Sequence, residues 1–68
     1  MEKTLKIDGM TCEHCSARVK DALEALDNVE SVKVSLFKNK AVVQGENLDE
    51  STLKSAVENS GYKVTSID

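Results

Sequence analysis

The stretch LKIDGMTCEHCSARVKDALEAL, residues 5–26, contains the change of hydrophobic period that decides the first half of the fold. Before Gly9, apolar and charged residues alternate, as they do in a half-buried strand. From Glu13 to Leu26 the apolar residues recur at the spacing of one helical face, and Thr11 is placed to cap that helix. We therefore predict a strand, a short loop and an amphipathic helix.

A period of two returns after Asn28 and predicts a β-hairpin over residues 31–45. Turn-forming residues surround Asn39, so the two strands are expected to join there, and Gly45 is expected to end the second strand. The same alternation directs Phe37 outward beside the turn. There it either covers a sheet edge or is exposed.

A second helix and a last strand complete the pattern. Asp49 is a predicted N-cap, Gly61 occupies the position of a left-handed C-cap glycine, and residues 62–67 form the final strand. The order β-α-β-β-α-β predicts an α+β, ferredoxin-like fold, in which two helices cover one face of a four-stranded antiparallel sheet. At this length, residues 1–68 are expected to form a single domain.

Composition excludes several classes of function. The chain has a net charge of −3 and only two aromatic residues, Phe37 and Tyr62, so nucleic acid is not an expected partner. No segment has the roughly 20 apolar residues of a membrane span, so direct membrane insertion is not expected. The start MEKTLKID lacks the apolar core of a signal peptide, and we expect a cytoplasmic protein. In that compartment two cysteines favour metal or redox chemistry over a structural disulfide.

The residues GMTCEHC, at positions 9–15, lie between the predicted strand and helix. Cys12 in the loop and Cys15 in the first helical turn can direct both sulfur atoms at one point, and the helix N-terminus favours their thiolate forms. Even with His14 as a third donor, these ligands are too few for a structural zinc site, which takes four. Soft thiolates select Cu(I), and an ion with only two ligands keeps an open flank.

The string GMTCEHC lies between a strand and a helix of a βαββαβ chain in which Gly61-Tyr62 precedes the last strand. On these residues the chain resembles the heavy-metal-associated domain family over its whole length, and most closely the small bacterial cytosolic copper chaperones. The resemblance implies that Cys12 and Cys15 hold Cu(I). It also implies a carrier, not an enzyme, which delivers copper to the metal-binding domains of a copper-transporting P-type ATPase or to a copper-responsive repressor.

Five further residues are candidates for supporting roles. Met10 matches a family methionine that turns inward under the loop, and we favour packing over copper ligation. Tyr62 either directs its phenol toward the cysteine sulfurs or is a boundary aromatic with a hydrated hydroxyl. His14 is expected to face solvent and, as a hypothesis, to supply a ligand in a copper-bridged homodimer. Arg18 and Lys20 are candidate docking residues, or part of an ordinary solvated helix face.

Three alternatives remain open from the sequence. A thiol-disulfide oxidoreductase would use Cys12 as its nucleophile, although the chain has no proline and therefore lacks the cis-proline of such sites. A mercury-binding protein of the same fold would share the two cysteines, but such proteins are typically exported. An excised domain of a copper ATPase would look the same, although the start at Met1 and the stop soon after the fourth strand favour a free-standing protein.

Overall fold

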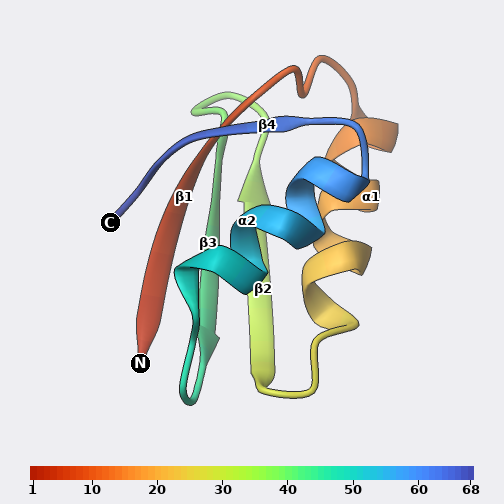
Figure 1. Cartoon of the computed structure of the whole chain (residues 1–68). Coiled ribbons are helices and arrows are strands. Elements are labelled where there is room, and N and C mark those ends of the chain that lie inside the picture. Colours follow the sequence, from red (N-terminus) through yellow and green to blue (C-terminus); the bar gives the residue numbers. More distant parts are fainter.

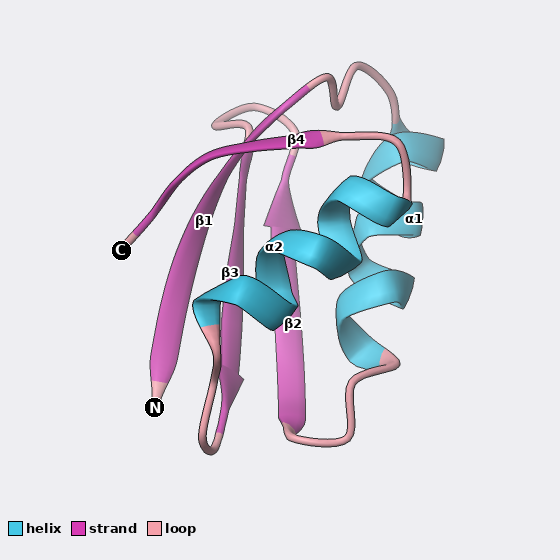
Figure 2. Cartoon of the chain, viewed as in Figure 1, coloured by secondary structure: helices cyan, strands magenta, loops and turns pink.

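The structure, a computed structural model, describes all 68 residues and confirms the predicted order of elements. These elements are β1 (Glu2–Asp8), α1 (Glu13–Glu24), β2 (Val29–Ser35), β3 (Lys40–Gly45), α2 (Glu50–Asn59) and β4 (Lys63–Ile67). The strands form one antiparallel sheet in the order β2-β3-β1-β4, and both helices cover the same face of it (Figures 1 and 2). This is the α+β, ferredoxin-like βαββαβ fold that the hydrophobic periods predict. Neither helix has the length and apolarity needed to cross a lipid bilayer.

One hydrophobic core lies between the helices and the sheet. Every strand and both helices contribute to it, and no buried side-chain polar atom lacks a hydrogen-bond partner. The buried apolar residues are Leu5, Ile7, Met10, Val19, Leu23, Val32, Ala41, Val43, Leu48, Leu53, Val57 and Val64. The core therefore consists largely of the residues that define the two periods in the sequence.

Helix α1 begins at Glu13 as predicted, but its N-cap residue and its last residue differ from the prediction. Its N-cap is Cys12, in extended conformation and without a side-chain capping bond, so the prediction of Thr11 is wrong. The Cys12 carbonyl accepts the N–H groups of Cys15 and Ser16 at 3.1 and 3.2 Å, which starts the helix one residue later than a Thr11 cap would. The helix ends at Glu24, whereas Leu26 was predicted to lie within it, although Leu26 still packs against the core.

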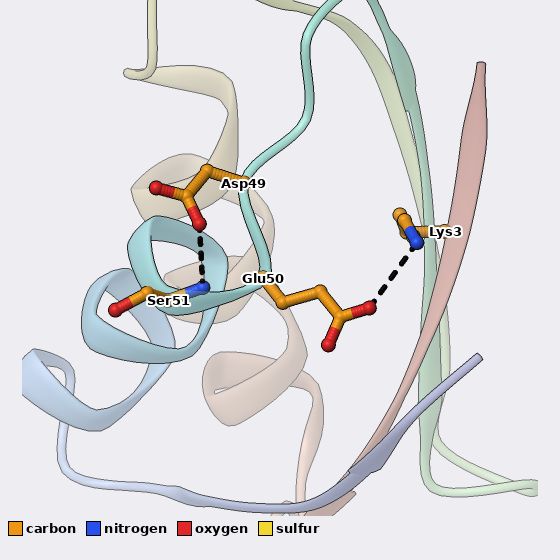
Figure 3. Close-up of polar contacts among 4 residues, drawn as sticks. All are labelled: Lys3, Asp49, Glu50 and Ser51. Atoms are coloured by element: carbon orange, nitrogen blue, oxygen red, sulfur yellow. Dashed lines mark hydrogen bonds and ion pairs between the residues drawn. The ribbon is translucent and has the colours of Figure 1, made fainter.

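Helix α2 begins as predicted. The carboxylate of Asp49 accepts a hydrogen bond from the Ser51 N–H at 3.0 Å, and Glu50 forms an ion pair with Lys3 of β1 at 3.2 Å (Figure 3). The ion pair is exposed and adds little stability. Gly61 follows the helix with φ +98°, which is the left-handed conformation expected of a C-cap glycine.

The β2–β3 turn is tied to the rest of the sheet. Strand β2 ends at Ser35. The alternation of apolar residues predicts Leu36 to lie in this strand, but it belongs to the turn. Asn39 adopts φ +52°, and its carbonyl accepts the Ile7 N–H of β1 at 2.8 Å. Phe37 is 96% exposed, so it does not cover a sheet edge.

Three connections lie at one end of the molecule: the β1–α1 loop, the β2–β3 turn and the α2–β4 loop (Figure 1). Successive elements run in opposite directions, which brings the start of α1, the β2–β3 turn and the residues before β4 to the same end. The two cysteines lie in the first of these connections and in the helical turn that follows it.

Candidate metal centre

The two thiols lie side by side where the β1–α1 loop enters the helix. Cys12 is exposed, Cys15 is half-buried, and their Sγ atoms are 3.2 Å apart with no disulfide between them. The extended backbone of Cys12 and the helical backbone of Cys15 direct both side chains to one side. The spacing of the cysteines thus produces the sulfur pair expected from the sequence.

Of the residues predicted to support the site, Met10 is buried and His14 is exposed. Met10 is only 4% exposed and belongs to the hydrophobic core, which is the position that a packing role requires. His14 is exposed in the first turn of α1. No third His, Cys, Asp or Glu side chain joins the cysteines in a cluster that could hold a metal. The donor set of the candidate centre in this structure is therefore two sulfur atoms.

Tyr62 links the α2–β4 loop to the β1–α1 loop. It is half-buried against the core, and a Cβ atom placed on Gly9 would lie 3.6 Å from its ring. Gly9 has φ +97°, a conformation that other residues seldom adopt. The glycine thus permits both the left-handed bend that ends β1 and the close approach of the tyrosine. Sequence reasoning missed this contact, because Gly9 and Tyr62 are far apart in the chain.

The electrostatic environment favours a thiolate at Cys15. The hydroxyl of Tyr62, by hydrogen bonding to the charged sulfur, is the largest of the causes that lower the pKa of Cys15 from 9.0 to about 6. The backbone of Thr11 and the thiol of Cys12 lower this pKa further, and partial burial opposes them. The same interaction raises the pKa of Tyr62, because a phenol that donates to a thiolate holds its proton more tightly. Cys15 is therefore largely ionised at neutral pH.

The reactivity of Cys15 in the metal-free, reduced protein should reveal this thiolate. We expect its alkylation rate by iodoacetamide to rise with a midpoint near pH 6 and to level off above it, since only the thiolate attacks. In Tyr62→Phe the midpoint should move to higher pH, because the largest stabilising contact is lost while the ring remains. Mass spectrometry of the labelled peptide measures the rate at each pH. An identical midpoint in the two proteins would contradict the role given to the hydroxyl.

The lowered pKa of Cys15 should also make the stability of the fold depend on pH. The folded state holds the Cys15 proton less tightly than the unfolded chain does, so the contribution of this group is fully present above the unfolded pKa near 9.0. That contribution is lost as the pH falls through about 6. The site is therefore best prepared for a cation at neutral and alkaline pH.

The arrangement can bind a soft cation at an accessible position. Two thiolates with a monovalent ion carry a net negative charge, and Arg18 lies near enough for its charge to act on Tyr62 beside the site. Because Cys12 is exposed, a third sulfur ligand can approach from solvent. The geometry therefore suits an ion that is exchanged, more than one that is enclosed.

The fold and this sulfur pair define a class of small metal-binding domains. The heavy-metal-associated domain family matches residues 4–63, and the chain belongs to that family. Among solved structures, the one titled CopZ metallochaperone superposes with a TM-score of 0.91 at 35% identity, covering 94% of this chain and 98% of that one.

The curated relatives include both free-standing chaperones and parts of larger proteins. The copper chaperone CopZ of Staphylococcus epidermidis is 37% identical over 93% of this chain and 96% of its own length. The mercuric reductase of Shigella flexneri is 44% identical, but the chain spans only 12% of it. The copper-exporting P-type ATPase of Vibrio cholerae is 37% identical, and the chain spans 7% of it. Of these three relatives, only the copper chaperone is matched over nearly its full length.

Proposed function

We propose that this protein is a copper carrier, which binds one Cu(I) between Cys12 and Cys15 and transfers it to another protein. The observation that carries the proposal is the pair of free sulfur atoms 3.2 Å apart, one exposed and one in an environment that favours the thiolate. Thiolates are the ligands that cuprous ions prefer. Similarity to copper chaperones over nearly their whole length supports the same conclusion and favours a cytoplasmic carrier without enzymatic turnover.

Transfer would proceed by exchange of ligands. A thiolate of the acceptor attacks the bound ion and forms a three-coordinate intermediate, after which one of the original Cu–S bonds breaks. Cys12 is the better candidate to leave first, because it is the more exposed of the two. Cys15 would leave last, since Tyr62 and the backbone of the preceding loop stabilise its thiolate. Copper is thus never released as a free ion.

The acceptor we propose is a heavy-metal-associated domain of a copper-transporting P-type ATPase. The homologous segment of the Vibrio cholerae ATPase supports this proposal. If donor and acceptor present the same two sulfur ligands, transfer should be within about 1.4 kcal/mol of thermoneutral, or tenfold in equilibrium constant. Transport driven by ATP would then give the direction. A copper-responsive repressor remains a further candidate acceptor.

The proposal is tested by mixing the copper-loaded protein with the metal-free domain of such an ATPase and following transfer by NMR. We expect transfer to be complete within the mixing time of the sample. The rate itself is measured by stopped-flow mixing. In the double variant Arg18→Glu, Lys20→Glu it should fall about tenfold at low salt and recover at high salt, because charges near a site mainly set encounter rates. Lys54→Glu on α2 is the control. An unchanged rate and salt dependence in the double variant would remove both residues from the docking surface.

His14 is the proposed auxiliary ligand in a copper-bridged homodimer. It is exposed in the turn between the two cysteines, so a second copy of the chain could bring its own sulfur atoms and this imidazole to the same ion. We expect sedimentation velocity with one Cu(I) per two chains to show a dimer that His14→Ala weakens severalfold. A dimer of equal stability in the variant would rule out ligation by the imidazole.

A carrier of mercuric ion is the second candidate, favoured by the 44% identity with a segment of a mercuric reductase. Hg(II) is also a soft cation that two thiolates can bind. Deletion of the gene separates the candidates, since sensitivity to copper salts alone supports a copper carrier and sensitivity to mercuric salts alone supports the other. An insulin-reduction assay tests the oxidoreductase alternative in the same way.

A further inference from the structure

The sheet face opposite the helices is rich in unpaired lysines. The buried residues of each strand point toward the helices, so their neighbours in sequence point to the open face. Lys6 of β1 lies directly opposite Lys40 of β3, and Lys33 of β2 lies opposite Val42, the second residue after Lys40. Lys63 of β4 lies opposite Asp8, at the end of β1 that leads to the thiols.

None of these lysines forms an ion pair. The only ion pair in the structure joins Lys3 to Glu50 on the helical side, so none of the open-face lysines lies within 4.0 Å of a carboxylate. Like charges directly opposite each other in a sheet destabilise it, as Lys6 and Lys40 must here. With Lys38 in the turn, this surface holds five of the nine Lys and Arg residues of an acidic chain. Glu2 and Asp8 of β1 share this face, but the lysines outnumber them, so the face carries an excess of positive charge.

An exposed aromatic side chain adjoins the same surface. Phe37 precedes Lys38 in the β2–β3 turn, is 96% exposed, and is the only large hydrophobic residue apart from Met1 that the fold leaves in solvent. The turn is held in place, since the Asn39 carbonyl accepts the Ile7 N–H and the Ser35 hydroxyl accepts the Lys38 N–H. The ring thus stands at the tip of an ordered hairpin beside the lysines.

We propose that the open sheet face and the tip of this hairpin form a docking surface for an anionic lipid bilayer, with Phe37 entering the headgroup region. An array of lysines beside one exposed aromatic ring matches the two attractions at such an interface, one electrostatic and one hydrophobic. A protein partner is less well matched, because lysine is depleted at protein interfaces and arginine is enriched there. Nucleic acid is less well matched because the one other aromatic ring, that of Tyr62, is packed against the core and offers no stacking platform on this face.

Docking of this kind would place the thiols near the membrane surface, because the Phe37 turn and the β1–α1 loop lie at the same end (Figure 1). A carrier held there would search for a membrane-embedded acceptor in two dimensions, a consequence that rests on the proposed function. The docking itself does not need copper. It can therefore be tested on the metal-free protein, so that its failure would leave copper binding and transfer untouched.

The experiment measures co-sedimentation of the reduced, metal-free protein with phosphatidylcholine vesicles that contain either no phosphatidylglycerol or about 30% of it. We expect binding only to the anionic vesicles, and weaker binding as salt screens the lysines. Lys40→Gln should lower the partition coefficient about fivefold, which corresponds to one lysine near an anionic surface. Lys54→Gln, which makes the same charge change on α2, should have little effect.

Two further measurements separate docking from general electrostatics. The chain has no tryptophan, so Phe37→Trp supplies a single reporter, whose emission should shift to the blue on anionic vesicles. Phe37→Ser should bind the vesicles at least fivefold more weakly, as loss of an inserted ring predicts. Lys40→Gln should also raise the unfolding midpoint, because it removes the repulsion from Lys6, so its weaker binding cannot be attributed to unfolding.

Several results would overturn the proposal. These are equal binding to neutral and anionic vesicles, equal losses in Lys40→Gln and Lys54→Gln, and unchanged emission of the tryptophan at position 37. Tighter binding to a DNA duplex than to the vesicles at equal salt would assign the surface to nucleic acid instead.

Discussion

Replacing Cys15 with serine should lower the affinity for Cu(I) on the order of a thousandfold or more, well beyond the 10–100-fold loss typical of a residue that only supports a metal ligand. The variant removes one of two sulfur donors, and it removes the one whose environment most favours the thiolate. A serine hydroxyl stays protonated and is a hard donor, which a cuprous ion binds poorly. Anaerobic titration in competition with a chelator of known Cu(I) affinity measures the effect.

Two variants control this experiment. Cys12→Ser should lose the single copper equivalent as well, because the structure brings no third donor to the pair. Ser16→Ala, in the same helical turn, should bind copper normally, since the Ser16 hydroxyl only donates to the Glu13 carbonyl. If Cys15→Ser retains an affinity within tenfold of the parent, the two sulfurs are not the copper ligands and the proposed function fails.

Gly45→Ala should destabilise the fold by about 3 kcal/mol or more, at the upper end of the cost of overpacking. A Cβ atom at this position would lie 2.1 Å from the backbone carbonyl oxygen of Asn28 and 3.0 Å from the Cα of Val29. Backbone atoms cannot turn aside as a side chain can, so β2 and β3 would have to separate where they pair. A chain of 68 residues has about 3–10 kcal/mol of total stability, so much of it would be lost. Urea denaturation followed by circular dichroism measures the change.

Gly61→Ala is the matched control, because it adds the same methyl group. Gly61 has φ +98°, and nothing lies within 4 Å of an added Cβ, so only conformational strain of about 1 kcal/mol is expected. If both variants lose the same free energy of unfolding, the clash with Asn28 is not the reason that glycine occupies position 45.

Much of the fold and of the candidate site could be predicted from local patterns. The change from a period of two to the spacing of a helix located both helices and the hairpin, because each element buries one face. Asp49 and Gly61 were predicted correctly as helix caps, since a cap depends on the residues beside it. Cys12 and Cys15 were predicted to meet because only three positions separate them across a strand-to-helix junction.

Local patterns failed where two distant segments meet or where neighbouring residues compete for one role. Thr11 and Cys12 could both precede a helix, and the path of the loop placed Cys12 at the cap. The closeness of Tyr62 to Gly9, the approach of Asn28 to Gly45 and the pairing of Lys6 with Lys40 all depend on strand register.

The amino-acid sequence by itself therefore determined the elements, their order and the sulfur pair, because hydrophobic period and short-range spacing act within a few residues. Only the tertiary structure decided what surrounds those sulfurs and which charges share a face. Those neighbours come from chain segments up to about fifty residues apart, and only packing around a common core brings them together.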